Sequence, residues 1–151
     1  MEIVVSKQTS RVEVTIVGLS GEVDGQNFQQ VIDKAKELYA TGARDFLVDM
    51  SSLTYISSAG LVAIHSIALM ALGEPLPDAE AGWSTYRSLG KTKESGKQQH
   101  VKLLNPGEQI KNVLEMVGFD NAFEIFSSLD DAVKAFYSES VDREVTVACA
   151  K

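Results

Sequence analysis

Cysteine and histidine are scarce in this sequence of 151 residues. The single cysteine, Cys149, excludes a disulfide bond within the chain. The two histidines, His65 and His100, leave too few ligands for a conventional Cys/His zinc site. We therefore expect neither a disulfide framework nor a bound metal ion.

Positive charge is also low. Lys and Arg number 14 against 21 Asp and Glu, so the formal net charge is −7. Nucleic acids and anionic membrane surfaces both attract clusters of Lys and Arg. The composition therefore argues against nucleic acids and membrane surfaces as partners.

A long apolar run is missing as well. The longest apolar stretch, 60–73, is shorter than the ~18–20 residues of a bilayer-spanning helix, and His65 and Ser66 interrupt it. The first ten residues lack the basic-then-apolar profile of a secretory signal. These features predict a buried helix at 60–73 and a cytoplasmic protein.

The length and the 44% hydrophobic content predict one globular domain over residues 1–137. Residues 73–100 form a long polar connection within it, and connections longer than ~12–15 residues are usually functional or disordered. Residues 138–151 are expected to be a tail, in which the alternating segment 145–150 could add an edge strand.

Strand patterns alternate with helix patterns along the chain. The first two strands are expected to form an antiparallel pair, and alternation at 12–17 predicts that one face of the second is more polar. Strands are expected at 2–6, 11–19, 46–50, 101–104 and 123–126, and helices at 26–40, from about 58, from 105 to 117 and from 128 to 136. Turns are expected at 21–25 and 51–57. This order predicts an α/β sandwich with a mixed sheet of about five strands and about four helices.

Residues that could carry catalysis lack supporting motifs. Ser88 and Lys91 match S-x-x-K without its companion motifs, and a phosphate-binding loop ending at Lys91 would need glycine where Thr85 stands. His65 is expected to be packed or edge-exposed, and His100 to be solvated. The acidic pairs Asp49/Glu22 and Asp130/Asp131 are explained by caps and surface charge. We expect no enzymatic activity and no cofactor.

Two serines stand where the strand at 46–50 leads into the apolar helix. Ser57 and Ser58 occupy the place of a helix N-cap, ahead of Ala59 and Gly60. Either serine can simply accept a backbone N–H bond. A phosphoryl group would also be tolerated there, beside free N–H groups and the positive end of the helix dipole. Gly60 weakens the first turn but opens access to it. Both interpretations, plain cap and regulatory serine, remain open.

Three stretches resemble one known family. They are 19–24 (LSGEVD), 46–61 (FLVDMSSLTYISSAGL) and 116–119 (MVGF). Together with the order of elements from about Ile3 to Phe136, they resemble the STAS domain of bacterial anti-sigma-factor antagonists, with 73–100 as an insert. In that family a partner that is both kinase and anti-sigma factor phosphorylates a serine at this helix start. The unmodified antagonist binds the partner, and a PP2C-type phosphatase resets it.

The resemblance also implies which residues take part. The family pattern is Asp-Ser-Ser/Thr-Gly, which places Ser57 at the acid, Ser58 at the first hydroxyl and Ala59 at the second. Ser58 is the implied phosphorylation site, with Ser57 as the alternative. The implied partner surface consists of Glu22, Asp24, Ser57, Ala59 and Gly60. The 73–100 insert is hypothesised to set partner choice, and self-association as a homodimer is left open.

A second interpretation keeps the fold without the phosphorylation cycle. The chain would then be a STAS scaffold or a regulatory partner in a sensory assembly or a transporter complex. The serine at the place of the family acid, Ser57, favours this alternative.

Overall fold

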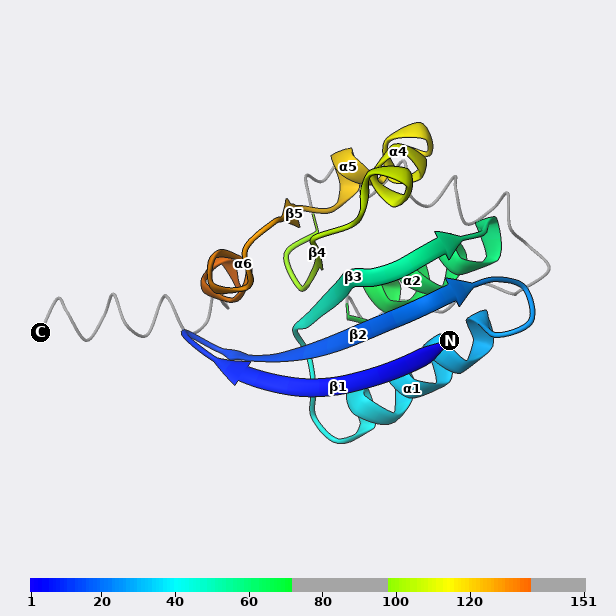
Figure 1. Ribbon diagram of the computed structural model, residues 1–151. Coiled ribbons are helices and arrows are strands. Elements are labelled where there is room, and N and C mark those ends of the chain that lie inside the picture. The colour runs from blue at the N-terminus through cyan, green and yellow to red at the C-terminus, as the bar shows by residue number, and fades with distance from the viewer. Residues whose placement is uncertain (72–97, 137–151) are drawn as a thin grey trace, which may run out of the picture.

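A mixed five-stranded sheet forms the centre of the computed structural model, which describes residues 1–71 and 98–136 (Figure 1). The strand order is β1-β2-β3-β4-β5; β1 pairs with β2 antiparallel, and the other pairs are parallel. The strands are β1 Glu2–Thr9, β2 Glu13–Val23, β3 Phe46–Ile56, β4 Val101–Leu104 and β5 Ile125–Phe126. The described helices are α1 Phe28–Ala40, α2 Ser58–Ala71, α4 Glu108–Met116, α5 Phe119–Ala122 and α6 Leu129–Ala135. The predicted fold class and the antiparallel first pair are confirmed.

The sheet is covered unequally on its two faces. The larger core lies on the face that α1 and α2 cover, and α4 closes it with Ile110 and Leu114 (Figure 1). The smaller core lies on the opposite face, where Ala132 and Val133 of α6 and the following Phe136 pack on the sheet. One end of that opposite face is therefore filled by α6, and no other helix of the described residues covers the rest of it.

The inner strand β2 is buried on both faces at residues 14–17. Its residues alternate between the two cores: Val14 and Ile16 belong to the smaller one, and Val17 and Leu19 to the larger. Thr15 is also buried. The expectation of a more polar face, that of Glu13, Thr15 and Val17, is therefore wrong at 15 and 17, because this face lies toward the larger core under α1 and α2. The side that α6 covers is the apolar one, with Val14 and Ile16.

Strands β2 and β3 run further than their patterns predicted. The expected turns at 21–25 and 51–57 are largely strand, with Gly21 paired to Leu53 and Val23 paired to Ile56. The pairing continues through two register shifts, between Gly18 and Ser20 and between Gly21 and Glu22. Each irregularity breaks the two-residue alternation of side chains, so these segments do not show a strand pattern.

The ends of the helices agree with the local sequence better than the ends of the strands do. Gly42 and Gly118 have φ of 110° and 84°, the left-handed conformation expected just after a helix. The Ser128 hydroxyl accepts a bond from the Asp131 backbone N–H at 3.4 Å, so Ser128 is the N-cap of the helix expected from 128. The short helix α5 was not predicted, and it reduces the last strand from the expected 123–126 to Ile125–Phe126.

Several expectations lie outside the described residues. These are the body of the 73–100 insert, the Ser88–Lys91 motif, the tail with its edge strand, and Cys149. The single-domain boundary at 137 also stays a prediction. Among the helices that the structure describes, none combines the length and the apolar character needed to cross a membrane.

Candidate functional site

Ser57 and Ser58 occupy different structural positions at the start of α2. Ser57 is the N-cap: its hydroxyl accepts from the Gly60 N–H at 3.4 Å, and its carbonyl accepts from the Leu61 N–H at 3.0 Å. Its own N–H donates to the Val23 carbonyl at 2.9 Å, which ties the helix start to the end of β2. Ser58 is the first helical residue and is exposed. The hydroxyl available at the surface is therefore that of Ser58.

Gly60 lets the first turn of α2 lie directly on the sheet. A Cβ atom at this position would lie 2.6 Å from Ile56 Cγ1, 3.0 Å from Val23 Cγ1 and 3.1 Å from the Val23 carbonyl oxygen. Gly60 is buried. Its role is thus close packing of the helix against the ends of β2 and β3, in contrast to the predicted opening of access from outside.

The loop after β2 holds Asp24 by local hydrogen bonds. The Asp24 carboxylate accepts from the Gln26 N–H at 2.9 Å, and the Asn27 side chain bonds both the Asp24 N–H and the Glu22 carbonyl, each at 2.9 Å. Asp24 is therefore a turn residue in this structure, and Glu22 keeps an exposed side chain.

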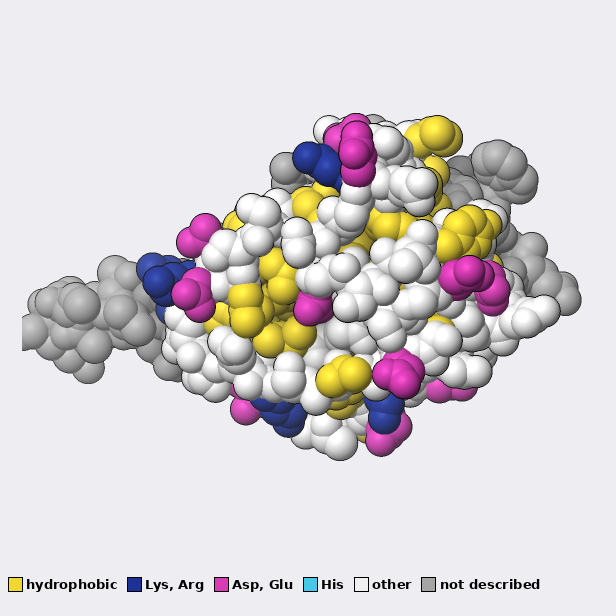
Figure 2. All heavy atoms as spheres, in the orientation of Figure 1, with side chains coloured by type: hydrophobic (Ala, Val, Ile, Leu, Met, Phe, Trp, Pro, Cys, Tyr) yellow, Lys and Arg dark blue, Asp and Glu magenta, His cyan; other side chains and the backbone are white. Residues whose placement is uncertain are grey.

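The pairing of β2 with β3 places Tyr55 next to the site. It pairs with Glu22 across β2 and β3, and it remains half exposed. The sequence analysis missed it because 51–57 read as a turn, although an aromatic residue next to Ile56 was a strand signal. Figure 2 shows acidic side chains beside apolar ones over the ends of β2 and β3, at the right of the view.

At the start of α2 the positive end of the helix dipole attracts an anion, whereas the carboxylates at the end of β2 oppose one. The first turn of α2 has no acidic side chain that would offset the positive end of its dipole. Glu22 and Asp24 form no salt bridge within residues 1–71 and 98–136. The site therefore combines two carboxylates without cationic partners and a helix end able to accept a phosphate on Ser58.

The two histidines occupy unlike environments. His65 is buried in α2, and neither of its ring nitrogens meets a hydrogen-bond partner in the described chain; burial lowers its pKa to about 4. The expectation of a packed His65 is confirmed. His100 was expected to be solvated, which is wrong: its Nδ1 lies 2.8 Å from Asp45 Oδ1, where the chain enters β3 and β4.

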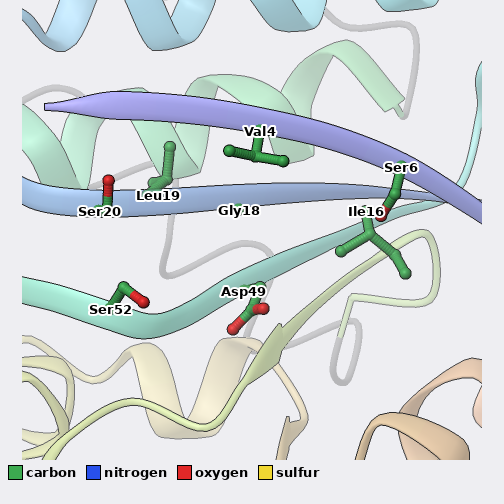
Figure 3. Close-up of a pocket in the computed structure, with 8 residues that line it drawn as sticks. All are labelled: Val4, Ser6, Ile16, Gly18, Leu19, Ser20, Asp49 and Ser52. Atoms are coloured by element: carbon green, nitrogen blue, oxygen red, sulfur yellow. The ribbon is translucent and has the colours of Figure 1, made fainter.

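A small groove lies on the open face of the sheet, opposite α1 and α2 (Figure 3). Its volume of about 170 Å³ is below the roughly 300–1,000 Å³ typical of ligand pockets. Asp49 is its only charged lining residue, and one of its carboxylate oxygens already accepts from the Ser51 N–H and hydroxyl. The lining residues are Val4, Ser6, Ile16, Gly18, Leu19, Ser20, Asp49 and Ser52.

The groove and the helix start do not form one site. Asp49 pairs with Gly18 in the middle of the sheet, whereas Glu22 pairs with Tyr55 at its end, so the two acids of the predicted pair are separated. Within the described ranges, no three His, Cys, Asp or Glu side chains are grouped so that they could hold a metal ion. The helix start remains the best-supported functional site.

Comparison with known proteins supports the fold and the family resemblance. The STAS domain family model matches residues 4–71. A proposed anti-sigma factor antagonist from Thermotoga maritima superimposes with a TM-score of 0.61 at 15% identity, covering 86% of this chain and 92% of that one. An anti-sigma factor antagonist from Mycobacterium paratuberculosis gives 0.55 at 21% identity, covering 89% and 93%. No curated protein matches the chain.

A third solved structure is a Bacillus protein in a modified state. The cell fate determinant SpoIIAA in its phosphorylated form gives a TM-score of 0.51 at 16% identity, covering 88% of this chain and 97% of that one. At these identities the likeness establishes the fold. Residues 4–71 of this chain are thus a match to the STAS domain family, and its fold is that of the SpoIIAA-like anti-sigma factor antagonists.

Proposed function

We propose that this protein is a cytoplasmic anti-sigma factor antagonist that binds an anti-sigma kinase through the start of α2 and is released by phosphorylation of Ser58. The observation that carries the proposal is that the two serines have different structural roles. Ser57 caps the helix, while Ser58 presents an exposed hydroxyl in its first turn. A phosphate on Ser58 would therefore leave the cap and the fold intact.

Charge explains how such a modification would act. A phosphoserine adds about −1.5 to −2 charges at neutral pH. In a packed interface that charge must be paired or desolvated, so it opposes binding without unfolding the domain. The likeness to a phosphorylated SpoIIAA supports the idea that a fold of this type accommodates the modification.

The chemistry would belong to the partners. A serine kinase would transfer the phosphate and a PP2C-type phosphatase would remove it, with this chain as the substrate of both. Glu22, Asp24, Ser57 and Ala59 would form the surface around Ser58, with buried Gly60 holding the first turn of α2 against the sheet. The chain would act on transcription by freeing a sigma factor.

The test is capture of partners from the source organism with tagged wild-type protein and the Ser58→Glu variant. Mass spectrometry should find an anti-sigma kinase with the wild type and not with Ser58→Glu. Ser58→Ala is the matched control, since it removes the hydroxyl without adding charge and should retain the partner. Equal capture of the kinase by wild type and Ser58→Glu would contradict the switch.

A second candidate function is a STAS scaffold that binds without a phosphorylation cycle. Two positions favour it: Ser57 stands at the place of the family acid, and Ala59 at that of the second hydroxyl. The Ala59→Ser variant restores that hydroxyl and discriminates between the two functions. If the purified kinase modifies Ala59→Ser but leaves the wild type unmodified, the scaffold is supported and the switch at Ser58 is excluded.

A further inference from the structure

Three large hydrophobic side chains are exposed in the part of the chain that the structure describes. They are Val4, Tyr55 and Met116, with 62%, 50% and 83% exposure. Val4 lies on β1 and Met116 ends α4, so neither belongs to the strand that leads into α2. Tyr55 alone belongs to the segment that leads into Ser57 and Ser58.

The backbone on both sides of Tyr55 is held firmly. Leu53 and Ile56 are buried in the larger core. Thr54 donates its hydroxyl hydrogen to the Gly21 carbonyl at 2.9 Å, across to β2. Tyr55 is thus presented on a rigid strand end, where a partner would lose little conformational freedom in ordering it. Aromatic side chains on such a support are typical anchors of protein interfaces.

The charge beside Tyr55 determines what kind of partner fits. Glu22 is its cross-strand neighbour, exposed and without a salt bridge in the described ranges. The turn residue Asp24 adds a second carboxylate two positions along. A complementary surface would offer an apolar pocket for the ring, bordered by a Lys or Arg that meets Glu22.

We propose that Tyr55 is the anchor of the partner interface, and that it inserts into an apolar pocket of the anti-sigma kinase while a basic residue at the pocket rim pairs with Glu22. This inference rests on the proposed function. It adds a specific contact that lies three residues before Ser58, so a phosphate on that serine would fall within the same contact area.

The test is titration calorimetry with the purified kinase identified by the capture experiment. Tyr55→Ala should weaken binding by about 30-fold or more, the range of an interface anchor. Tyr55→Phe keeps the ring and should stay within about threefold of the wild type. Glu22→Gln should weaken binding about threefold to tenfold and reduce its salt dependence. Met116→Ala is the matched control for losing an exposed apolar side chain and should bind as the wild type does.

The outcomes separate the two proposals. Tyr55→Ala binding within twofold of both the wild type and Met116→Ala would overturn the anchor while leaving the proposed function in place. The anchor would also be overturned if Tyr55→Ala lost affinity together with a lower urea unfolding midpoint and Tyr55→Phe lost as much affinity. The loss would then come from a damaged fold. If the wild type binds no anti-sigma kinase, the proposed function fails and the anchor fails with it.

Discussion

At the scale of single residues, neighbouring side chains of the same type have separate roles. Ser57 and Ser58 are chemically identical, yet the hydroxyl of Ser57 bonds the helix backbone and that of Ser58 is exposed. The two serines differ because Ser57 stands just before the helix and Ser58 stands inside its first turn. Only a side chain at the N-cap position can bond back to the free N–H groups of that turn.

Substitution of the two serines should separate these roles. Ser57→Ala removes a cap and should lower the free energy of unfolding by about 1 kcal/mol. Ser58→Ala should change it by less than about 0.5 kcal/mol, as is usual for exposed positions without special contacts. Urea unfolding followed by circular dichroism measures both. A larger loss for Ser58→Ala than for Ser57→Ala would show that Ser58 is the cap.

His65 should make the stability of the protein depend on pH. Its pKa falls from 6.5 in the unfolded chain to about 4 in the folded protein, because burial disfavours the charged ring. Between these values the unfolded state binds more protons, so stability is full above pH 6.5 and is lost as pH falls towards 4. At about 1.4 kcal/mol per pH unit, acidification from pH 7 to pH 5 should cost about 2 kcal/mol.

The measurement is urea unfolding of the wild type and of His65→Leu at both pH values. The variant cannot take up this proton, so its loss between pH 7 and pH 5 should be about 2 kcal/mol smaller. Comparing the two proteins cancels the carboxyl groups, which titrate in both. Parallel losses would show that His65 is not protonated on unfolding, or that it is accessible in the folded state.

At the scale of elements, the site depends on how closely α2 approaches the ends of β2 and β3. The Ser57 N–H bonds the Val23 carbonyl, and Gly60 leaves no room for a Cβ atom against Val23 and Ile56. This contact places the first turn of α2, with exposed Ser58, beside the end of β2, which carries Glu22.

Gly60→Ala should therefore destabilise the protein even though alanine favours helices. Helix propensity alone would stabilise the variant by about 1 kcal/mol. A Cβ at 2.6 Å from Ile56 Cγ1 forces a shift, and overpacking of this kind costs about 1–3 kcal/mol. We expect a net loss, measured as a lower urea midpoint.

Gly25→Ala is the control for this substitution. Its added Cβ would have no heavy atom within 4 Å, so a change of at most about 0.5 kcal/mol is expected. A stabilised Gly60→Ala variant would mean that α2 can move away from β2 without penalty, and that the close approach is not required.

At the scale of the whole molecule, a buried lysine with a partly exposed carboxylate partner links the sheet to the end of α6. Lys102 of β4 points to the smaller core with its side chain 2% exposed, and its ammonium lies 2.7 Å from Glu124 Oε1. The same nitrogen lies 5.2 Å from the centre of the Phe136 ring. One side chain therefore joins β4, the segment before β5 and the residue that follows α6.

Removing the two partners of this pair should have unequal effects. Glu124→Gln leaves a buried ammonium without its counter-charge and should lower the free energy of unfolding by about 1–3 kcal/mol, less than for a fully buried pair because Glu124 is partly exposed. Lys102→Met keeps the length of the side chain and removes the charge, so a change of about 1 kcal/mol or less is expected. Urea unfolding of both variants and the double variant tests the order, and a larger loss for Lys102→Met would contradict it.

The sequence by itself determined the order of the strands and of the longer helices, the helix-ending glycines and the position of the two serines. These features depend on residues a few positions apart, through side-chain periodicity and helix capping. Only the tertiary structure decided that Ser57 is the cap, that both faces of β2 are buried at residues 14–17, and that Tyr55 lies beside Glu22. The last contact joins residues from two strands across two register shifts. Such pairing is set by how whole strands align, because an irregular register leaves no regular alternation in either strand for the sequence to show.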